Sequence, residues 1–230
     1  MSTTANTGKR HRENMKKVDP NRRYTVEEAV ALLKQFASAK FDETVEISIK
    51  LGVDPKKADQ MVRGTFSLPK GIGKTQRVIV IAEGERAQQA QAAGADAVGG
   101  ADLMKRIEDG WLDFDVVLTT PDMMRQVGKL GRVLGPKGLM PSPKSGTVTE
   151  DIVTAVNEFK AGKIEYRTDA LGNINVPVGK RSFPDEDLIA NIKAFLERIQ
   201  ESRPAAVKGR FIQKVCISST MSPGIRLAVA

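Results

Sequence analysis

Apolar and polar residues alternate strictly between Glu43 and Leu51. In an extended chain, one side of this segment carries Val45, Ile47, Ile49 and Leu51, and the polar residues lie on the other. A period of two is incompatible with a helix and predicts a strand with one buried face and one solvated face. The segment therefore requires a sheet that other elements cover on one side.

Other amphipathic helices and strands, each with one apolar face, are expected before and after this strand in the sequence. They are a helix that begins at the capping box Thr25–Glu28, a β-hairpin of residues 163–167 and 173–178 around the turn 169–172, a helix with an acidic first turn at Asp185, and a strand over 211–218.

The middle of the chain follows a different pattern. Residues 77–82 form a nearly continuous apolar strand, an Ala-rich helix is expected over 85–93, and a further strand and helix over 116–119 and 150–160. This order is typical of an α/β domain. We therefore expect an insert over about residues 68–160, bounded by the glycine-containing segments 68–73 and 161–162, where two crossing strands can act as a hinge.

The formal net charge of +8 favours a polyanionic partner, either nucleic acid or an acidic membrane surface. A membrane is disfavoured, because the longest apolar run extends only from Val78 to Ala82 and no signal peptide is recognisable. The expected location is the cytoplasm. Aromatic residues make up only 5% of the chain, so recognition of a structured RNA is favoured over base stacking on a single strand.

Three segments concentrate this positive charge. Residues 1–23 form a basic arm, expected to be flexible or partly helical. Residues 123–149 contain no acidic residue and interleave basic residues with glycines, and no acid follows Glu201. An isolated basic stretch is usually a solvated surface, but three of them favour RNA.

Motifs for catalysis or cofactors are weak. Gly73-Lys74-Thr75 lacks the glycine that a phosphate-binding loop needs at position 68, where leucine stands. The sole histidine, His11, lies in the basic arm, and the sole cysteine, Cys216, is expected to be a buried structural thiol. We expect no cofactor, no metal site and no enzymatic activity. An enzyme or nucleotide-binding module on the α/β middle remains the alternative from another class.

The segment Gly131-Arg132-Val133-Leu134-Gly135-Pro136-Lys137-Gly138-Leu139-Met140-Pro141 closely resembles the L-one family of large-subunit ribosomal proteins. The resemblance extends over essentially the whole chain, through residues 39–46, 62–65, 109–111 and 219–221. It implies an α+β discontinuous domain, residues 1–67 and 161–230, with a split β-α-β type of sheet and helices. This domain would carry an inserted three-layer α/β domain, residues 68–160.

The resemblance also implies a function. Members bind ribosomal RNA of the 23S type, form the mobile stalk that assists release of deacylated tRNA from the exit site, and often repress translation by binding their own operon mRNA. A monomer is expected off the ribosome. A free regulatory RNA-binding protein outside the ribosome is a further alternative.

Residue by residue, the resemblance predicts contacts to ribosomal RNA from Lys40, Phe41, Thr44, Glu46, Ser219, Thr220, Met221 and Ser222, with less support for Arg167 and Asp169. The basic surface of the insert, expected to face exit-site tRNA, contains Lys129, Arg132, Lys137 and Lys144. Phe41 is equally compatible with a core position. Ser222 stands where the family usually has glycine, which leaves the local conformation open.

Overall fold

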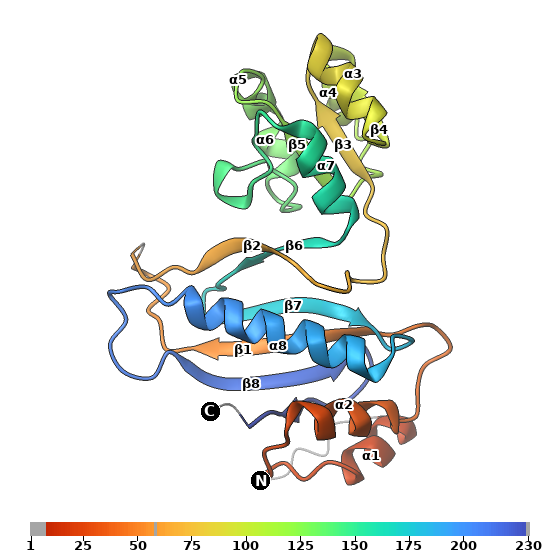
Figure 1. Cartoon of the computed structure of the whole chain (residues 1–230), viewed down its shortest axis with the longest axis vertical. Helices are drawn as coiled ribbons and strands as arrows, with labels where there is room; N and C mark the ends of the chain where they lie inside the picture. Colours follow the sequence, from red (N-terminus) through yellow and green to blue (C-terminus); the bar gives the residue numbers. More distant parts are fainter. Residues whose placement is uncertain (1–7, 58, 229–230) are drawn as a thin grey trace. The chain divides into compact units, whose positions relative to one another are not determined.

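The computed structural model describes residues 8–57 and 59–228 of the chain. The chain divides into two compact units, one of Met1–Gly73 with Tyr166–Ala230 and the other of Lys74–Glu165. Both contain helices and strands (Figure 1), so the protein is of mixed α/β type. This is compatible with the expected α+β domain. The predicted insert, residues 68–160, begins and ends a few residues before the second unit.

The first unit is built around a four-stranded antiparallel sheet with the order β7-β1-β8-β9. Its elements are α1 (Lys9–Lys16), α2 (Val26–Lys34), β1 (Thr44–Leu51), β2 (Arg63–Ser67), β7 (Asn173–Lys180), α8 (Asp185–Glu201), β8 (Ile212–Ser219) and β9 (Ile225–Arg226), with the end of β6 (Lys163–Arg167).

The alternation in β1 divides the two faces of this sheet as predicted. Val45, Ile47 and Ile49 are at most 1% exposed, and Ile47 is paired with Val176 of β7 and Ile217 of β8. Helices α2 and α8 pack on each other and on the sheet, with α8 lying over its strands (Figure 1). The predicted capping box of Thr25 and Glu28 is present at the start of α2.

Cys216 lies on the other face of the sheet, which corrects the prediction of a buried thiol. Val215 and Ile217 occupy the core, and Cys216 between them is only partly buried. Its cross-strand partners are Ser48 and Arg226. Because strand side chains alternate, an apolar run across an amphipathic strand must place its middle residue on the polar face.

The predicted hairpin around residues 169–172 is wrong. The turn exists, because the Asp169 amide donates to the Asn173 carbonyl (2.8 Å) and the Gly172 amide to the Asp169 carbonyl (3.1 Å). The strands on either side diverge into different sheets, however, with β6 paired to β2 and β7 to β1. Local residues specify the turn, whereas the partner of each strand is set by distant residues; the Thr168 amide, for instance, donates to the Val62 carbonyl (3.0 Å).

The second unit is a three-layer α/β structure. Its elements are β3 (Val78–Ile81), α3 (Glu85–Ala92), β4 (Ala97–Gly99), α4 (Ala101–Glu108), β5 (Val116–Thr119), α5 (Met124–Val127), η1 (Gly128–Leu130), α6 (Gly131–Leu134), η2 (Pro143–Ser145) and α7 (Ile152–Lys160). The parallel sheet has the order β4-β3-β5.

Both faces of the central strand β3 are covered, which explains its continuous apolar sequence. Val78 and Val80 pack in a core with Phe159 of α7, while Ile79 and Ile81 pack in a second core with the residues of α4, α5 and the short helices that follow. All four β3 residues are at most 1% exposed. The basic segment 123–149 is therefore anchored by its apolar residues to one side of the sheet.

We predict that the first unit folds without the second. Its sheet, α2 and α8 come entirely from residues outside 74–165. Replacing Lys74–Glu165 by a glycine-rich linker of about ten residues should leave a cooperatively unfolding protein, since each doubling of loop length costs only about 0.6 kcal/mol. Far-UV circular dichroism during urea unfolding is the measurement. A non-cooperative transition would contradict independent folding.

Candidate RNA-binding site

Two segments that are distant in sequence meet at one end of the sheet of the first unit. The chain enters β1 at Thr44 and leaves β8 after Ser219, and Val45 is the cross-strand partner of Ser219. The ladder continues one step further, because the Thr220 amide donates to the Thr44 carbonyl (3.0 Å). The structure thus brings together Lys40, Phe41, Thr44 and Glu46 with residues 219–222.

A buried carboxylate joins these two segments. Glu43 is 1% exposed. Its Oε1 accepts a hydrogen bond from the Ala39 amide (2.7 Å), and its Oε2 accepts from the Met221 amide (3.3 Å) and from the Ser219 hydroxyl. The Arg181 guanidinium lies 3.9 Å away. We call these five residues the Glu43 network.

The Glu43 network keeps this carboxyl group ionised. Burial by itself would raise the pKa of Glu43, but the hydrogen bonds from Ser219, Ala39 and Met221 and the charge of Arg181 outweigh it, and the net pKa lies below its ordinary value. The charged form is therefore the one that holds the two segments in place.

Two large apolar side chains project into solvent next to this network. Phe41 is 53% exposed and Met221 is 47% exposed, and the neighbouring Lys40 is exposed as well. The core position considered for Phe41 is thus excluded. An aromatic ring and a thioether beside a cation can pack on ribose and base surfaces while the ammonium group binds phosphate.

The hydroxyl groups of Thr44 and Thr220 already make hydrogen bonds within the protein. Thr220 Oγ1 accepts a hydrogen bond from the Thr44 amide (3.1 Å), and Lys180 Nζ donates to Thr44 Oγ1 (2.8 Å). Thr44 keeps its hydroxyl proton for an external acceptor. Glu46 is exposed one step along β1, on the same face as Thr44.

Ser219 and Ser222 stabilise the site through hydrogen bonds within the protein. Ser219 is 3% exposed and its hydroxyl donates to Glu43, which leaves this group no access to an external ligand. Ser222 closes a turn, because its amide donates to the Ser219 carbonyl (3.0 Å) and its Oγ accepts from the Ser219 amide (2.8 Å). Among the described residues only glycines have positive φ, so the turn does not require glycine at Ser222.

Arg167 and Asp169 are not part of this cluster. Along the β1–β7 ladder Thr44 is paired with Lys180 and Lys50 with Asn173, so the Asp169 turn lies at the other end of the strands. Asp169 is exposed and accepts hydrogen bonds from Asn173 and Leu171, which hold its pKa below the ordinary value. Arg167 is also exposed.

The basic surface expected in the second unit is solvent-facing where it is described. Lys129, Arg132 and Lys137 are exposed, on η1, on α6 and in the turn after α6. The side chain of Lys144 lies outside the described part of the structure. Gly138 has a φ of 71°, a conformation that glycine adopts without strain.

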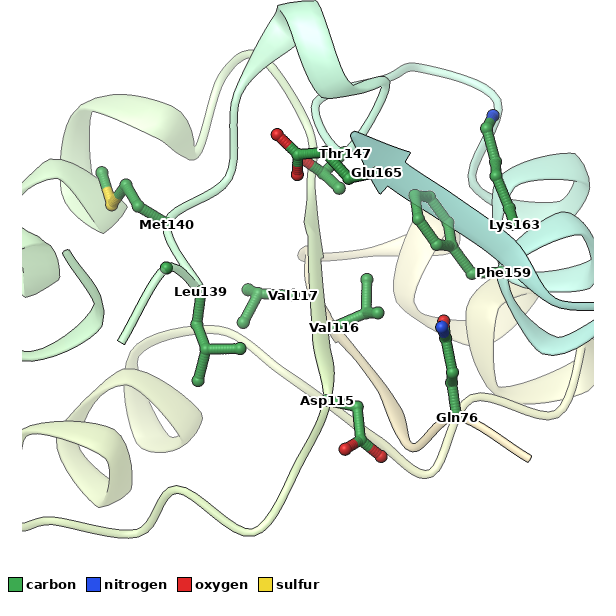
Figure 2. Close-up of a pocket in the computed structure, with 11 residues that line it drawn as sticks. Gln76, Asp115, Val116, Val117, Leu139, Met140, Thr147, Phe159, Lys163 and Glu165 are labelled. Atoms are coloured by element: carbon green, nitrogen blue, oxygen red, sulfur yellow. The ribbon is translucent and has the colours of Figure 1, made fainter. Parts of the chain in front are cut away.

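The second unit contains a pocket of about 210 Å³, whose lining side chains are shown in Figure 2. The Asp115 carboxylate is bound by Lys74 Nζ (2.7 Å) and the Arg77 amide (3.0 Å), and these contacts outweigh the effect of burial and lower its pKa. Lys163 points in the opposite direction from Asp115 and is paired with Glu158 (2.5 Å).

Comparison with known families decides between the remaining classes of protein. A family model described as "Ribosomal protein L1p/L10e family" matches residues 33–223. The chain belongs to this family. Members are structural, non-enzymatic proteins, so the chain is a structural constituent of the large ribosomal subunit and not an enzyme. No helix within residues 8–57 and 59–228 is long and apolar enough to cross a membrane.

Glu43 and Arg181 were not identified from the sequence as part of the site, although one signal was present. Glu43 lies in phase with Val45, Ile47 and Ile49, the buried positions of β1. A carboxylate in the buried phase of a strand is tolerated only when charged or hydrogen-bonding partners surround it. The alternation therefore marks Glu43 as a buried, partnered acid.

We predict that Glu43→Gln lowers the free energy of unfolding by about 2–3 kcal/mol at pH 7, because hydrogen bonds to a charged group are lost and Arg181 loses its counter-ion. The matched control is Glu46→Gln on the exposed face of the same strand, which should change stability little. Urea unfolding of both variants measures the difference. An unchanged free energy of unfolding in Glu43→Gln would contradict a structural role for the Glu43 network.

The same pair of proteins tests the pKa of Glu43. A folded-state pKa below the ordinary 4.5 stabilises the protein fully above about pH 4.5, and this stabilisation is lost as the pH falls through the folded-state pKa. The stability gap between wild type and Glu43→Gln should therefore narrow below about pH 4.5. A gap that is independent of pH would be inconsistent with a depressed pKa.

Proposed function

We propose that this protein binds large-subunit ribosomal RNA directly through the cluster of Lys40, Phe41, Thr44, Glu46, Thr220 and Met221, which we call the β1–β8 cluster. The observation that carries the proposal is the pair of exposed apolar side chains, Phe41 and Met221, on segments that the buried Glu43 network joins, beside the exposed Lys40. Prior ordering of these side chains reduces the entropy lost on binding.

The chemistry of the β1–β8 cluster suits a structured RNA. Phe41 and Met221 provide apolar contact to ribose and base faces, Lys40 provides a phosphate contact, and the Thr44 hydroxyl can donate to a 2′-hydroxyl. Glu46 repels phosphate and accepts hydrogen bonds only. Glu46 therefore favours a placement of the RNA in which 2′-hydroxyls or base amino groups face this carboxylate, and it disfavours placements in which a phosphate does so.

We predict that Phe41→Ala and Met221→Ala each weaken the binding of in vitro transcribed large-subunit ribosomal RNA about tenfold, as expected for the loss of one well-packed apolar contact. Met61→Ala removes a comparably exposed methionine elsewhere in the first unit and should bind like wild type. Filter-binding titration measures all three. Equal affinities would remove the β1–β8 cluster from the RNA interface.

The domain arrangement follows from this assignment. We infer that residues 1–67 and 161–230 form one discontinuous RNA-binding domain and that residues 68–160 form an inserted domain. Both segments of the β1–β8 cluster come from the first compact unit, which supports this division.

We further propose that the insert faces exit-site tRNA on the mobile stalk and assists its release. The support is the exposure of Lys129, Arg132 and Lys137, which lie in the acid-free segment 123–149 of the second unit, apart from the β1–β8 cluster in sequence. Such a surface binds a phosphate backbone without reading its sequence.

We predict that large subunits carrying the triple change Lys129→Gln, Arg132→Gln and Lys137→Gln retain the protein in high salt but hold deacylated tRNA at the exit site several-fold more weakly. The control triple Lys56→Gln, Lys57→Gln and Lys105→Gln removes the same charge at other exposed positions and should behave like wild type. Loss of co-sedimentation in the first triple alone would assign this surface to ribosomal RNA instead.

Co-sedimentation also separates the ribosomal protein from a free RNA-binding regulator, since only the former stays with large subunits in high salt. In the free, monomeric state we propose that the β1–β8 cluster binds the protein's own operon mRNA and represses translation in the cytoplasm. Such an mRNA must fold into a structure similar to the ribosomal site, because one rigid surface serves both.

A further inference from the structure

A second group of cations lies along the β8–β9 edge of the sheet in the first unit. Arg23, Arg210, Lys214 and Arg226 line one shallow pocket of about 50 Å³. They come from four separate segments: the loop before α2, the loop before β8, strand β8 and strand β9. We call these four residues the edge cluster. None of them belongs to the β1–β8 cluster.

Among residues 8–57 and 59–228, the edge cluster has no counter-ion. The residues that line its pocket include no carboxylate, and within the described part of the chain none of the four cations forms an ion pair. Within that part of the chain, their one side-chain hydrogen bond is from Arg210 Nε to the Ile212 carbonyl (3.0 Å). All four side chains are exposed. The charges of the edge cluster are therefore available to an external anion.

Two lysines face each other across neighbouring strands next to the edge cluster. Lys50 of β1 and Lys214 of β8 are direct cross-strand partners. Like charges in this position destabilise an antiparallel pair by repulsion. Lys50 Nζ donates to the Leu171 carbonyl and lies near the Asp169 carboxylate, which partly offsets its charge, whereas no carboxylate lines the pocket that contains Lys214. A bound anion would relieve the repulsion, which favours a ligand over a merely solvated surface.

We propose that the edge cluster binds phosphates of the same RNA that occupies the β1–β8 cluster, so this inference rests on the proposed function. Guanidinium groups match phosphate geometry in two hydrogen bonds each, and the edge cluster holds three of them. No aromatic residue lines the pocket, so a base has no ring to stack on there. The contact is therefore to the RNA backbone and not to its sequence.

The two clusters are connected along one strand. Thr220, Ser218, Cys216 and Lys214 alternate along β8 and share its polar face, with Arg226 of β9 beside Cys216. Six residues of strand correspond to roughly 20 Å. An RNA helix seated on Phe41 and Met221 that follows this face reaches the edge cluster. The β1–β8 cluster then fixes register, and the edge cluster adds electrostatic affinity.

The test compares two triple variants by filter binding to in vitro transcribed large-subunit ribosomal RNA over a series of KCl concentrations. The edge triple is Arg210→Gln, Lys214→Gln and Arg226→Gln, and the control triple is Lys56→Gln, Lys57→Gln and Lys105→Gln. Each lost phosphate contact flattens the slope of log affinity against log salt by roughly 0.7–0.9. We expect the edge triple to flatten it by about two units and the control triple to leave it unchanged.

The Phe41→Ala protein completes the design, since loss of an apolar contact should lower affinity without changing the slope. If wild type binds this RNA no better than an unrelated RNA, the proposed function fails. If wild type binds specifically and the edge triple, folded by circular dichroism, keeps the slope of the control, only the edge cluster is excluded from the RNA interface. A changed affinity for anionic vesicles or acidic peptides with an unchanged RNA slope overturns the proposal in the same way.

Discussion

The ionised carboxylate of Glu43 is the constraint on which the proposed RNA-binding surface depends. It lies at the end of the sheet, where the β1–β8 ladder stops and two loops would otherwise be free. By accepting hydrogen bonds from the Ala39 and Met221 amides it links residues more than 170 positions apart in sequence to one group. The backbone that carries two half-exposed apolar side chains, Phe41 and Met221, is thereby held in place. The desolvation of the charge is offset by the hydrogen bonds and by Arg181.

The two units divide the chemistry of the chain between them. The first has a sheet with one dry face and one polar face, and the polar face leads from the β1–β8 cluster to the basic edge. The second has a sheet buried on both sides, and its basic segment of short helices and turns carries exposed cations. Under our proposal, this separation lets one protein hold ribosomal RNA with one unit while the other meets a transient tRNA.

Local patterns in the sequence were sufficient for the elements but not for their partners. The alternation of β1, the capping box at Thr25 and the apolar run of β3 each depend on near neighbours, and each is present as expected. The expected hairpin failed because β6 and β7 take different partners. Burial of Cys216 was overestimated because its apolar neighbours lie on the opposite face.

The sequence indicated which residues form the candidate site, but not the role of each of them. Resemblance to the family located the residues that meet at the end of the sheet, but it could not separate those that face solvent from those that support them. Ser219 and Glu43 are supports, and this distinction depends on hydrogen bonds between residues that only the fold brings together.

The edge of the sheet at β9 bears on how the free protein avoids aggregation. An exposed edge strand offers unpaired backbone groups to any other strand it meets, and such edges promote aggregation. Strand β9 has only two residues, and its outer side is covered, because the Tyr24 amide donates to the Arg226 carbonyl (2.9 Å) and the Ala228 amide donates to the Tyr24 carbonyl (2.7 Å). The segment at Tyr24 thus limits the pairing of this edge with a strand of a second chain.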